Sequence, residues 1–180
     1  ILYRHLWLYR QGNRGLEMQG NLLENLQISS AFVPVDMQTA ANTGDWANMA
    51  PFRKIVCVLF KSAGTAGDDP VITLEQATSN AGAGNKALNF TTIYSKVGTL
   101  TSVGQFTKIT QAAANTYEDE TSAESQAIIA IEIDESDLDT ANGYTHIQMS
   151  VGDVGSNAQL GCGFYLGLAK NGQSTVDSSL

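Results

Sequence analysis

From residue 31 onward, apolar residues occur only in short runs, and this spacing limits the possible folds more than any other feature of the chain. The runs are rich in Val, Ile, Thr, Tyr and Phe, and Gly, Asn, Asp or Pro interrupts them roughly every 8 to 15 residues. β-Branched and aromatic residues favour strands, whereas the interrupting residues favour turns. We therefore expect strands near residues 31–36, 53–61, 70–78, 87–96, 104–110, 126–134, 144–151 and 158–169.

Two of these segments indicate how the sheets are buried. Ile129, Ile131 and Ile133 alternate with small or charged residues, which is typical of a strand with one buried face. The stretch KIVCVLFK, residues 54–61, is apolar on both faces, which predicts a central strand whose second face is covered by a loop or by another subunit. Eight strands at this spacing predict an all-β fold, an antiparallel β-sandwich that is jelly-roll-like. Only LLENL (22–26) and DESDLD (134–139) suggest helical turns.

The pattern divides the chain of 180 residues into an extended N-terminal arm (1–30), a β-sandwich domain (31–170) and a C-terminal tail (171–180). Residues 1–17 carry three arginines and one glutamate, a local charge of 3 − 1 = +2, so the rest of the chain sums to −8 − 2 = −10. A body this acidic repels phosphate backbones, and we expect no nucleic-acid partner. No stretch approaches the ~18 apolar residues of a membrane helix, so we expect no membrane association and a protein made in the cytoplasm.

The last expected strand, LGCGFYLGLA, has two very different faces. Apolar side chains occupy one face, and three glycines with Tyr165 occupy the other. Because glycine weakens a strand, three on one face suggest close approach by other backbone or side chains. A bent or bulged strand and a contact between subunits both fit this pattern. The apolar face comprises Leu160, Cys162, Phe164, Leu166 and Leu168, and the other face comprises Gly161, Gly163, Tyr165 and Gly167.

The two cysteines, Cys57 and Cys162, lie inside apolar runs without CxxC spacing or a nearby histidine. We expect buried free thiols, because a lone cysteine packs as a small apolar residue. A disulfide between Cys57 and Cys162 is the alternative if their strands are neighbours. Neither a zinc site nor a thiol nucleophile is indicated.

Two loops resemble known ion- or phosphate-binding motifs, but both fail the templates. In SNAGAGNKALNF (79–90), Asn85 stands where a phosphate loop needs glycine, and Ala87 where it needs Ser or Thr. In the acidic stretch DESDLDTANGYT (134–145), a calcium loop starting at Asp137 would have Ala141 at its fifth position, where Asp or Asn is required. We expect a hairpin connection and an exposed turn, and no cofactor.

The pattern also gives little support for catalysis. The only histidines are His5 and His146, and no G-x-S-x-G sequence accompanies them. The alternative is a catalytic Ser-His-Asp set whose members are distant in sequence and come together only in the folded protein. We expect a protein that is not an enzyme.

Several segments together resemble a family of small proteins encoded among the structural genes of tailed bacteriophages. The likeness covers roughly residues 30–169 and includes no catalytic motif. Residues 1–17 lie outside it. The segments are FKSAGTAGDDPVITLEQAT, YSKVGTLTSVGQFTKITQAAANTYEDETSAESQA, IEIDESDLD with GY, and VGDVGSNAQLGCGFYL.

This resemblance implies a virion structural protein, a head decoration (cement) or minor capsid protein, located in the virion and assembled in the host cytoplasm. Its partners would be the major capsid protein and further copies of the chain, as a homo-oligomer with a trimer favoured, and multivalent binding would stabilise the head. Arginine and aromatic residues supply most interface anchors. The candidate interface residues are Arg4, Trp7, Tyr9, Arg10 and Arg14 in the arm, with Gly161, Gly163, Tyr165 and Gly167 in the last strand.

The alternative function is a tail- or fibre-associated module that recognises carbohydrate on the host surface. Such a module needs exposed aromatic residues around a shallow cleft. The candidates for this role are Tyr94, Tyr117, Tyr144 and Tyr165.

Overall fold

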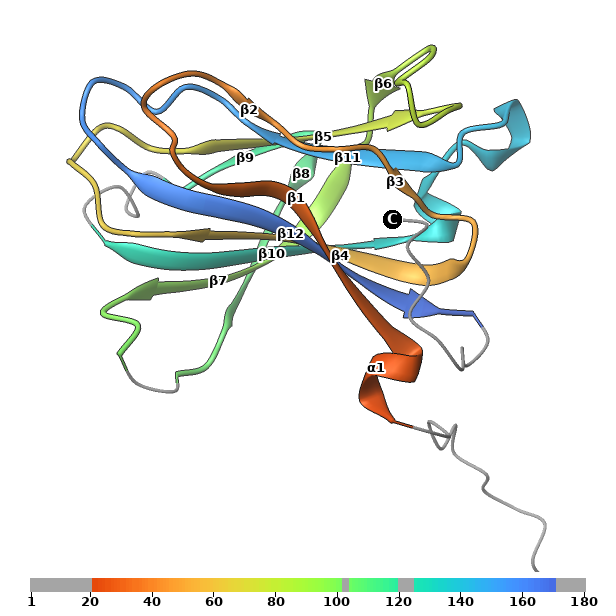
Figure 1. The fold of residues 1–180 in the computed structure, drawn as a ribbon, viewed down its shortest axis with the longest axis horizontal. Helices are drawn as coiled ribbons and strands as arrows, with labels where there is room; N and C mark the ends of the chain where they lie inside the picture. The colour runs from red at the N-terminus through yellow and green to blue at the C-terminus, as the bar shows by residue number, and fades with distance from the viewer. Residues whose placement is uncertain (1–20, 102–103, 120–124, 171–180) are drawn as a thin grey trace, which may run out of the picture.

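Two antiparallel β-sheets pack face to face in the computed structural model, which describes residues 21–101, 104–119 and 125–170 (Figure 1). Strands β1, β12, β4 and β10 of sheet A form the lower layer of Figure 1 and sheet B forms the upper layer, while β8 of sheet A rises to the level of sheet B. In spatial order, sheet A contains β1 (Leu26–Asp36), β12 (Leu160–Ala169), β4 (Phe52–Lys61), β10 (Gln126–Asp134), β7 (Phe90–Gly98) and β8 (Thr107–Ala114). Sheet B contains β2 (Asn42–Thr43), β11 (His146–Val151), β5 (Val71–Ala77) and β6 (Lys86–Ala87), with β3 (Ala47–Asn48) paired to β11 and β9 (Thr116–Glu118) paired to β5.

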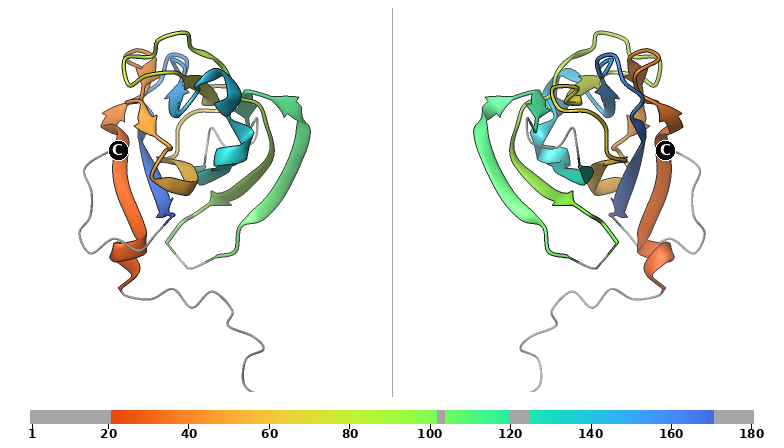
Figure 2. Two further views of the ribbon diagram at one scale, coloured as in Figure 1. Left: turned by 90° about the vertical axis from the view of Figure 1, so that its right-hand side faces the viewer. Right: turned by 90° about the vertical axis from the view of Figure 1, so that its left-hand side faces the viewer.

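The strand order is that of a jelly roll. The order β1-β12-β4-β10 in one sheet faces the order β2-β11-β5-β9 in the other, and every pair is antiparallel. This arrangement places the two Greek keys of a jelly roll around one core. Strands β7 and β8 extend sheet A beyond β10, and in Figure 2 they lie on the side opposite to β1. The predicted all-β antiparallel sandwich is therefore confirmed.

Short helices lie where the sequence suggested them. Helix α1 (Leu22–Asn25) precedes β1, and two 3-10 turns, η1 (Glu135–Asp137) and η2 (Thr140–Asn142), follow β10. The backbone N–H of Asp134 donates to the Asp137 carboxylate at 2.8 Å, so an acidic side chain does cap the first of these turns.

The boundaries differ from the sequence-based expectation in three places. Strand β1 begins at Leu26 and pairs with β12, so the sandwich includes residues that we assigned to the arm. The strand expected at 87–96 is divided into β6 and β7, and the strand expected at 104–110 is displaced to Thr107–Ala114. The short strands β2, β3 and β9 were not expected, because two or three residues are too few to show a period.

The core lies between the sheets and is almost entirely apolar. Ile129, Ile131 and Ile133 on β10 are at most 1% exposed, as their alternation predicted. They face Leu74 and Met149 of sheet B, which are fully buried. Strand β4 lies between β12 and β10, which confirms that the stretch apolar on both faces is central. Burial of large apolar side chains is the main source of stability in such a sandwich.

Candidate functional site

The glycine face of β12 points into the sandwich. A Cβ atom at Gly161 would lie 2.6 Å from the sulfur of Met37, and one at Gly167 would lie 2.6 Å from the ring of Phe52. At Gly163 a Cβ atom would meet the ring of Phe32 at 2.5 Å and the methyl group of Met149 at 2.6 Å. The expected close approach is present, but side chains of the same chain make it. The assignment of these three glycines to a contact between subunits is therefore corrected.

Tyr165, the fourth candidate on this face, ties the two layers together. Its side chain is 1% exposed, and its hydroxyl accepts a hydrogen bond from the backbone N–H of Met149 and donates one to the carbonyl oxygen of Asp45, both at 2.9 Å. Burial raises the pKa of Tyr165 well above its ordinary value, so the phenol stays protonated. Tyr165 is an internal residue, and its assignment to an interface is corrected as well.

A Tyr165→Phe variant is expected to lose about 1–3 kcal/mol of unfolding free energy, because the buried backbone N–H of Met149 and the partly buried carbonyl of Asp45 lose their partner. Urea unfolding followed by circular dichroism measures this loss. Tyr94→Phe is the matched control, since the Tyr94 hydroxyl has no hydrogen bond within the described residues. Equal midpoints for the two variants would contradict the role of Tyr165.

The outer face of sheet A carries the apolar side of β12. Sheet B covers the inner side of sheet A, and the described part of the chain places no third layer of helix or strand on the outer side (Figure 1). We call the following residues the outer apolar face. On β12 they are Leu160, Cys162, Phe164, Leu166 and Leu168. On the neighbouring strands they are Ile28, Val56, Val58, Phe60, Ile128 and Ala130.

The members of this face lie side by side in the register of the sheet. One row across the strands consists of Cys162, Phe60 and Ile128. Two residues further along the strands, a second row on the same face consists of Phe164, Val58 and Ala130. Several remain open to solvent, with Leu160 60%, Ile28 57% and Phe60 45% exposed. Isolated exposed apolar residues are ordinary, but a contiguous patch on one sheet marks a site of interaction.

Charged groups lie at the margin of the outer apolar face. At one end Lys54 contacts Glu132 at 2.6 Å and Asp134 at 3.2 Å. These hydrogen bonds, first that of Glu132, raise the pKa of Lys54. On the far side of the sheet Lys96 and Lys108 extend from β7 and β8. An apolar centre with a charged margin is the usual anatomy of a protein interface.

The two cysteines lie on opposite faces of sheet A and are both free. Cys57 pairs with Tyr165 and faces the core, whereas Cys162 pairs with Phe60 and faces outward. Burial raises the pKa of Cys57 to about 12 and also raises that of Cys162. The disulfide that the sequence left open does not form, although the two strands are neighbours, because the thiols point in opposite directions.

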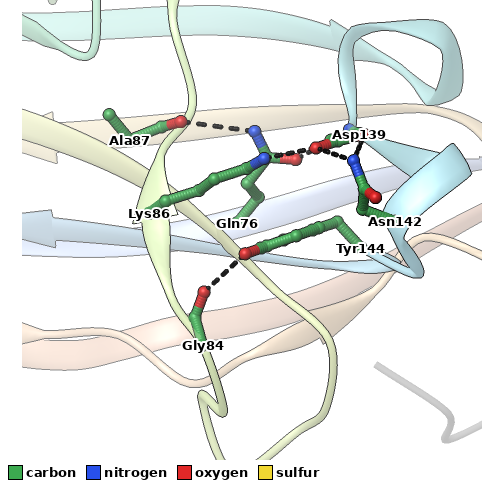
Figure 3. A network of polar contacts seen from close by, with 7 residues as sticks. All are labelled: Gln76, Gly84, Lys86, Ala87, Asp139, Asn142 and Tyr144. Carbon is green, nitrogen blue, oxygen red and sulfur yellow. Dashed lines mark hydrogen bonds and ion pairs between the residues drawn. The ribbon is translucent and has the colours of Figure 1, made fainter.

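The two loops that resemble binding motifs are packed against each other (Figure 3). Lys86 of the glycine-rich loop forms an ion pair with Asp139 of the acidic loop, with 2.5 Å between Nζ and Oδ2. The same ammonium lies 4.0 Å from the centre of the Tyr144 ring, and the Tyr144 hydroxyl donates to the carbonyl oxygen of Gly84 at 2.8 Å. The basic and acidic groups that suggested ligand binding therefore bind each other.

Asp139 is also held in place by hydrogen bonds from within the chain. Asn142 Nδ2 donates to both carboxylate oxygens at 2.9 Å, and the backbone N–H of Asp139 donates to Gln76 Oε1 at 2.8 Å. Gln76 in turn donates to the carbonyl oxygen of Ala87 at 3.2 Å. The hydrogen bond from Lys86, followed by that from Asn142, lowers the pKa of Asp139. The cluster positions the β6 hairpin on the end of the sandwich.

An Asp139→Asn variant is expected to loosen this hairpin at neutral pH. Because the folded pKa of Asp139 is lowered, the contribution of its carboxylate is complete above the ordinary value of 3.8 and disappears as the pH falls through the lowered pKa. Amide exchange of residues 78–88, corrected for intrinsic rates, should be faster in the variant at neutral pH and equal to wild type in strong acid. Asp153→Asn, at an exposed carboxylate, is the control and should change the exchange rate of this hairpin neither at neutral pH nor in strong acid.

His146 stands apart from any catalytic arrangement in the described residues. Its Nδ1 lies 3.0 Å from Thr145 Oγ1, and no described carboxylate binds the ring. Burial lowers the pKa of His146. The described ranges contain no group of three or more His, Cys, Asp or Glu side chains that could hold a metal ion.

The four candidate tyrosines do not gather around a cleft. Tyr165 and Tyr117 are 1% and 8% exposed and belong to the core. Tyr144 lies in the loop cluster, and Tyr94 lies on the outer side of β7 beside Ala130. The arm candidates Arg4, Trp7, Tyr9, Arg10 and Arg14 lie outside the described residues.

Comparisons of the chain with family models, curated proteins and solved structures find no match. In the ranges that the structure describes, no helix has the length and apolar character needed to cross a membrane. The fold thus defines an all-β jelly-roll sandwich, and its most distinctive surface is the outer apolar face.

Proposed function

We propose that the chain is a virion structural protein, a decoration (cement) protein that stabilises a viral head by multivalent binding to the major capsid protein. The observation that carries the proposal is a jelly-roll sandwich with an apolar patch on one outer face. Jelly rolls recur in viral capsid domains, and a contiguous exposed patch suits a protein that works by adhesion. The resemblance to proteins encoded among phage structural genes supports the same function.

The internal contacts of the two loops also favour an adhesive function. Lys86 and Asp139 neutralise each other, and the Tyr144 hydroxyl is bound to backbone. A protein that turns over a ligand needs polar groups directed toward an open site. Here those groups fasten a hairpin, which leaves surface adhesion as the function that the described residues support best.

In this proposal the N-terminal segment supplies the contact with the capsid shell, and the outer apolar face is left for contacts between copies. Residues 1–17 combine Trp7 and Tyr9 with three arginines, and their local charge of +2 differs from that of the acidic remainder. Arginine and aromatic side chains are the commonest anchors of protein interfaces. We assign to this segment the contact with the capsid shell.

The test is the number of copies in purified particles of the virus that encodes the chain. Quantitative mass spectrometry should find hundreds of copies per particle, and removal of residues 1–17 should abolish co-sedimentation with heads. A few copies per particle would point instead to the tail, and absence from the particle would refute a structural function.

A further inference from the structure

We propose that a second copy of this chain docks on the outer apolar face of sheet A, in a two-fold contact in which the two sheets pack back to back. This inference does not depend on the proposed function, because self-association is a property of the isolated chain. Its first support is composition. The centre of the face, around Val58, Phe60 and Phe164, contains no charged side chain, and depletion of charge at the centre is what distinguishes interfaces from other surfaces.

The size of the face fits a stable contact between two copies. The four strands β1, β12, β4 and β10, spaced ~4.8 Å apart, and ten residues of β12, rising ~3.3 Å each, cover about 600 Å² in projection. Side-chain relief increases the accessible area beyond this projection, toward the ~800 Å² that each partner contributes to a standard interface. Within this area Leu160, Ile28 and Phe60 are 60%, 57% and 45% exposed, whereas Val58 is 4% exposed because its neighbours on the face cover it.

The edges of sheet A do not offer a competing way to associate. Strand β1, at one edge, contains Pro34 and has two register shifts against β12. Strand β8, at the other edge, carries Lys108 and is largely polar at its start. Proline, bulges and lysine are the features that prevent an edge from pairing with another chain. A second copy is therefore expected to bind the outer apolar face and not an edge strand of sheet A.

Charge at the margin of the outer apolar face allows a second copy to bind. The chain has a net charge of −8, so two copies repel each other over most of their surface. The margin of the outer apolar face is different, because Lys54, Lys96 and Lys108 accompany Glu132 and Asp134 there. A margin with both signs allows a rotated copy to oppose unlike charges, while the apolar centres meet.

A face that binds itself makes an isologous contact, which closes after two copies. The inference is therefore a dimer, and it differs from the trimer that the resemblance suggested. It also gives Cys162 a use as a reporter. The thiol is half-buried on this face beside Phe60, whereas Cys57 lies in the core of the same sheet.

Sedimentation equilibrium of the full chain tests the inference directly. The wild-type chain should be a dimer, and Phe60→Glu should raise the dissociation constant about 100-fold or more, because a carboxylate would be buried against apolar residues. Maleimide labelling of Cys162 should be slow in the wild-type dimer and faster in the Phe60→Glu variant. Cys57 should stay unlabelled in both, which reports that the core is folded.

Thr116→Glu is the matched control, because Thr116 is an exposed strand residue on the outer side of sheet B. It should leave both the dimer and the labelling of Cys162 unchanged. If Cys57 becomes labelled in Phe60→Glu, the variant is misfolded, and Ile28→Lys on the edge strand takes its place. A monomeric or trimeric wild-type chain, or a dimer that folded variants on this face do not weaken, would overturn the inference.

Discussion

A Gly167→Val variant is expected to lose about 3 kcal/mol of unfolding free energy, near the upper end of what overpacking a core costs. The new side chain would enter the space of the Phe52 ring, which is 0% exposed and has no room to withdraw. A typical domain is stable by only about 5–15 kcal/mol, so the loss should be visible as a large shift in the urea midpoint. If Gly167 served a contact between subunits instead, the variant would fold normally and only its association would change.

Gly152→Val is the control for this experiment. A Cβ atom at Gly152 meets nothing within 4 Å, and the residue is exposed. Its unfolding free energy should stay within about 0.5 kcal/mol of wild type, as for most surface substitutions. Equal losses at the two glycines would show that the effect is a general penalty of valine and not a collision with Phe52.

The fold was predictable from local features because strand period and turn residues are properties of neighbouring positions. The alternation at Ile129, Ile131 and Ile133 identifies a buried face without knowledge of the partner sheet. The two apolar faces of residues 54–61 identify a central strand in the same way. These signals missed the strands of two or three residues, which pair because longer neighbours hold them in place, and they misplaced the boundaries of β1, β7 and β8.

The buried face of the last strand could not be predicted in this way. Local pattern would assign Phe164 and Leu166 to the core and the glycines to the surface. In the structure the glycines face inward because Met37, Phe52 and Met149, from other parts of the chain, fill the space beside them. Which face of β12 is buried depends on the size of side chains that are distant in the sequence. The sequence of the strand itself does not indicate them.

The contact between the two loops was hidden for the same reason. Lys86 and Asp139 are 53 residues apart in sequence, and each of their loops by itself resembles only a ligand-binding template. The signal that could have connected them was charge, since the one cation in the glycine-rich loop lacked a partner there and the acidic loop had a surplus of carboxylates.

A double-mutant cycle between Phe52 and Gly167 is expected to show strong coupling. Phe52→Ala alone should cost about 3–5 kcal/mol, because it leaves a cavity at a fully buried site. In the double variant the valine side chain would occupy part of that cavity, and each change would relieve the defect of the other. The double variant should therefore be more stable than the sum of the single losses predicts, by about 1–3 kcal/mol.

Urea unfolding of the four proteins measures this coupling, and Gly167→Ala replaces Gly167→Val if the valine variant does not fold. The cycle tests the packing of β12 independently of any partner, because both residues lie inside one chain. Additivity within about 0.5 kcal/mol would mean that the two residues do not share space. It would place the glycine face of β12 somewhere other than against Phe52, and the outer apolar face would then no longer be the side of β12 turned toward solvent.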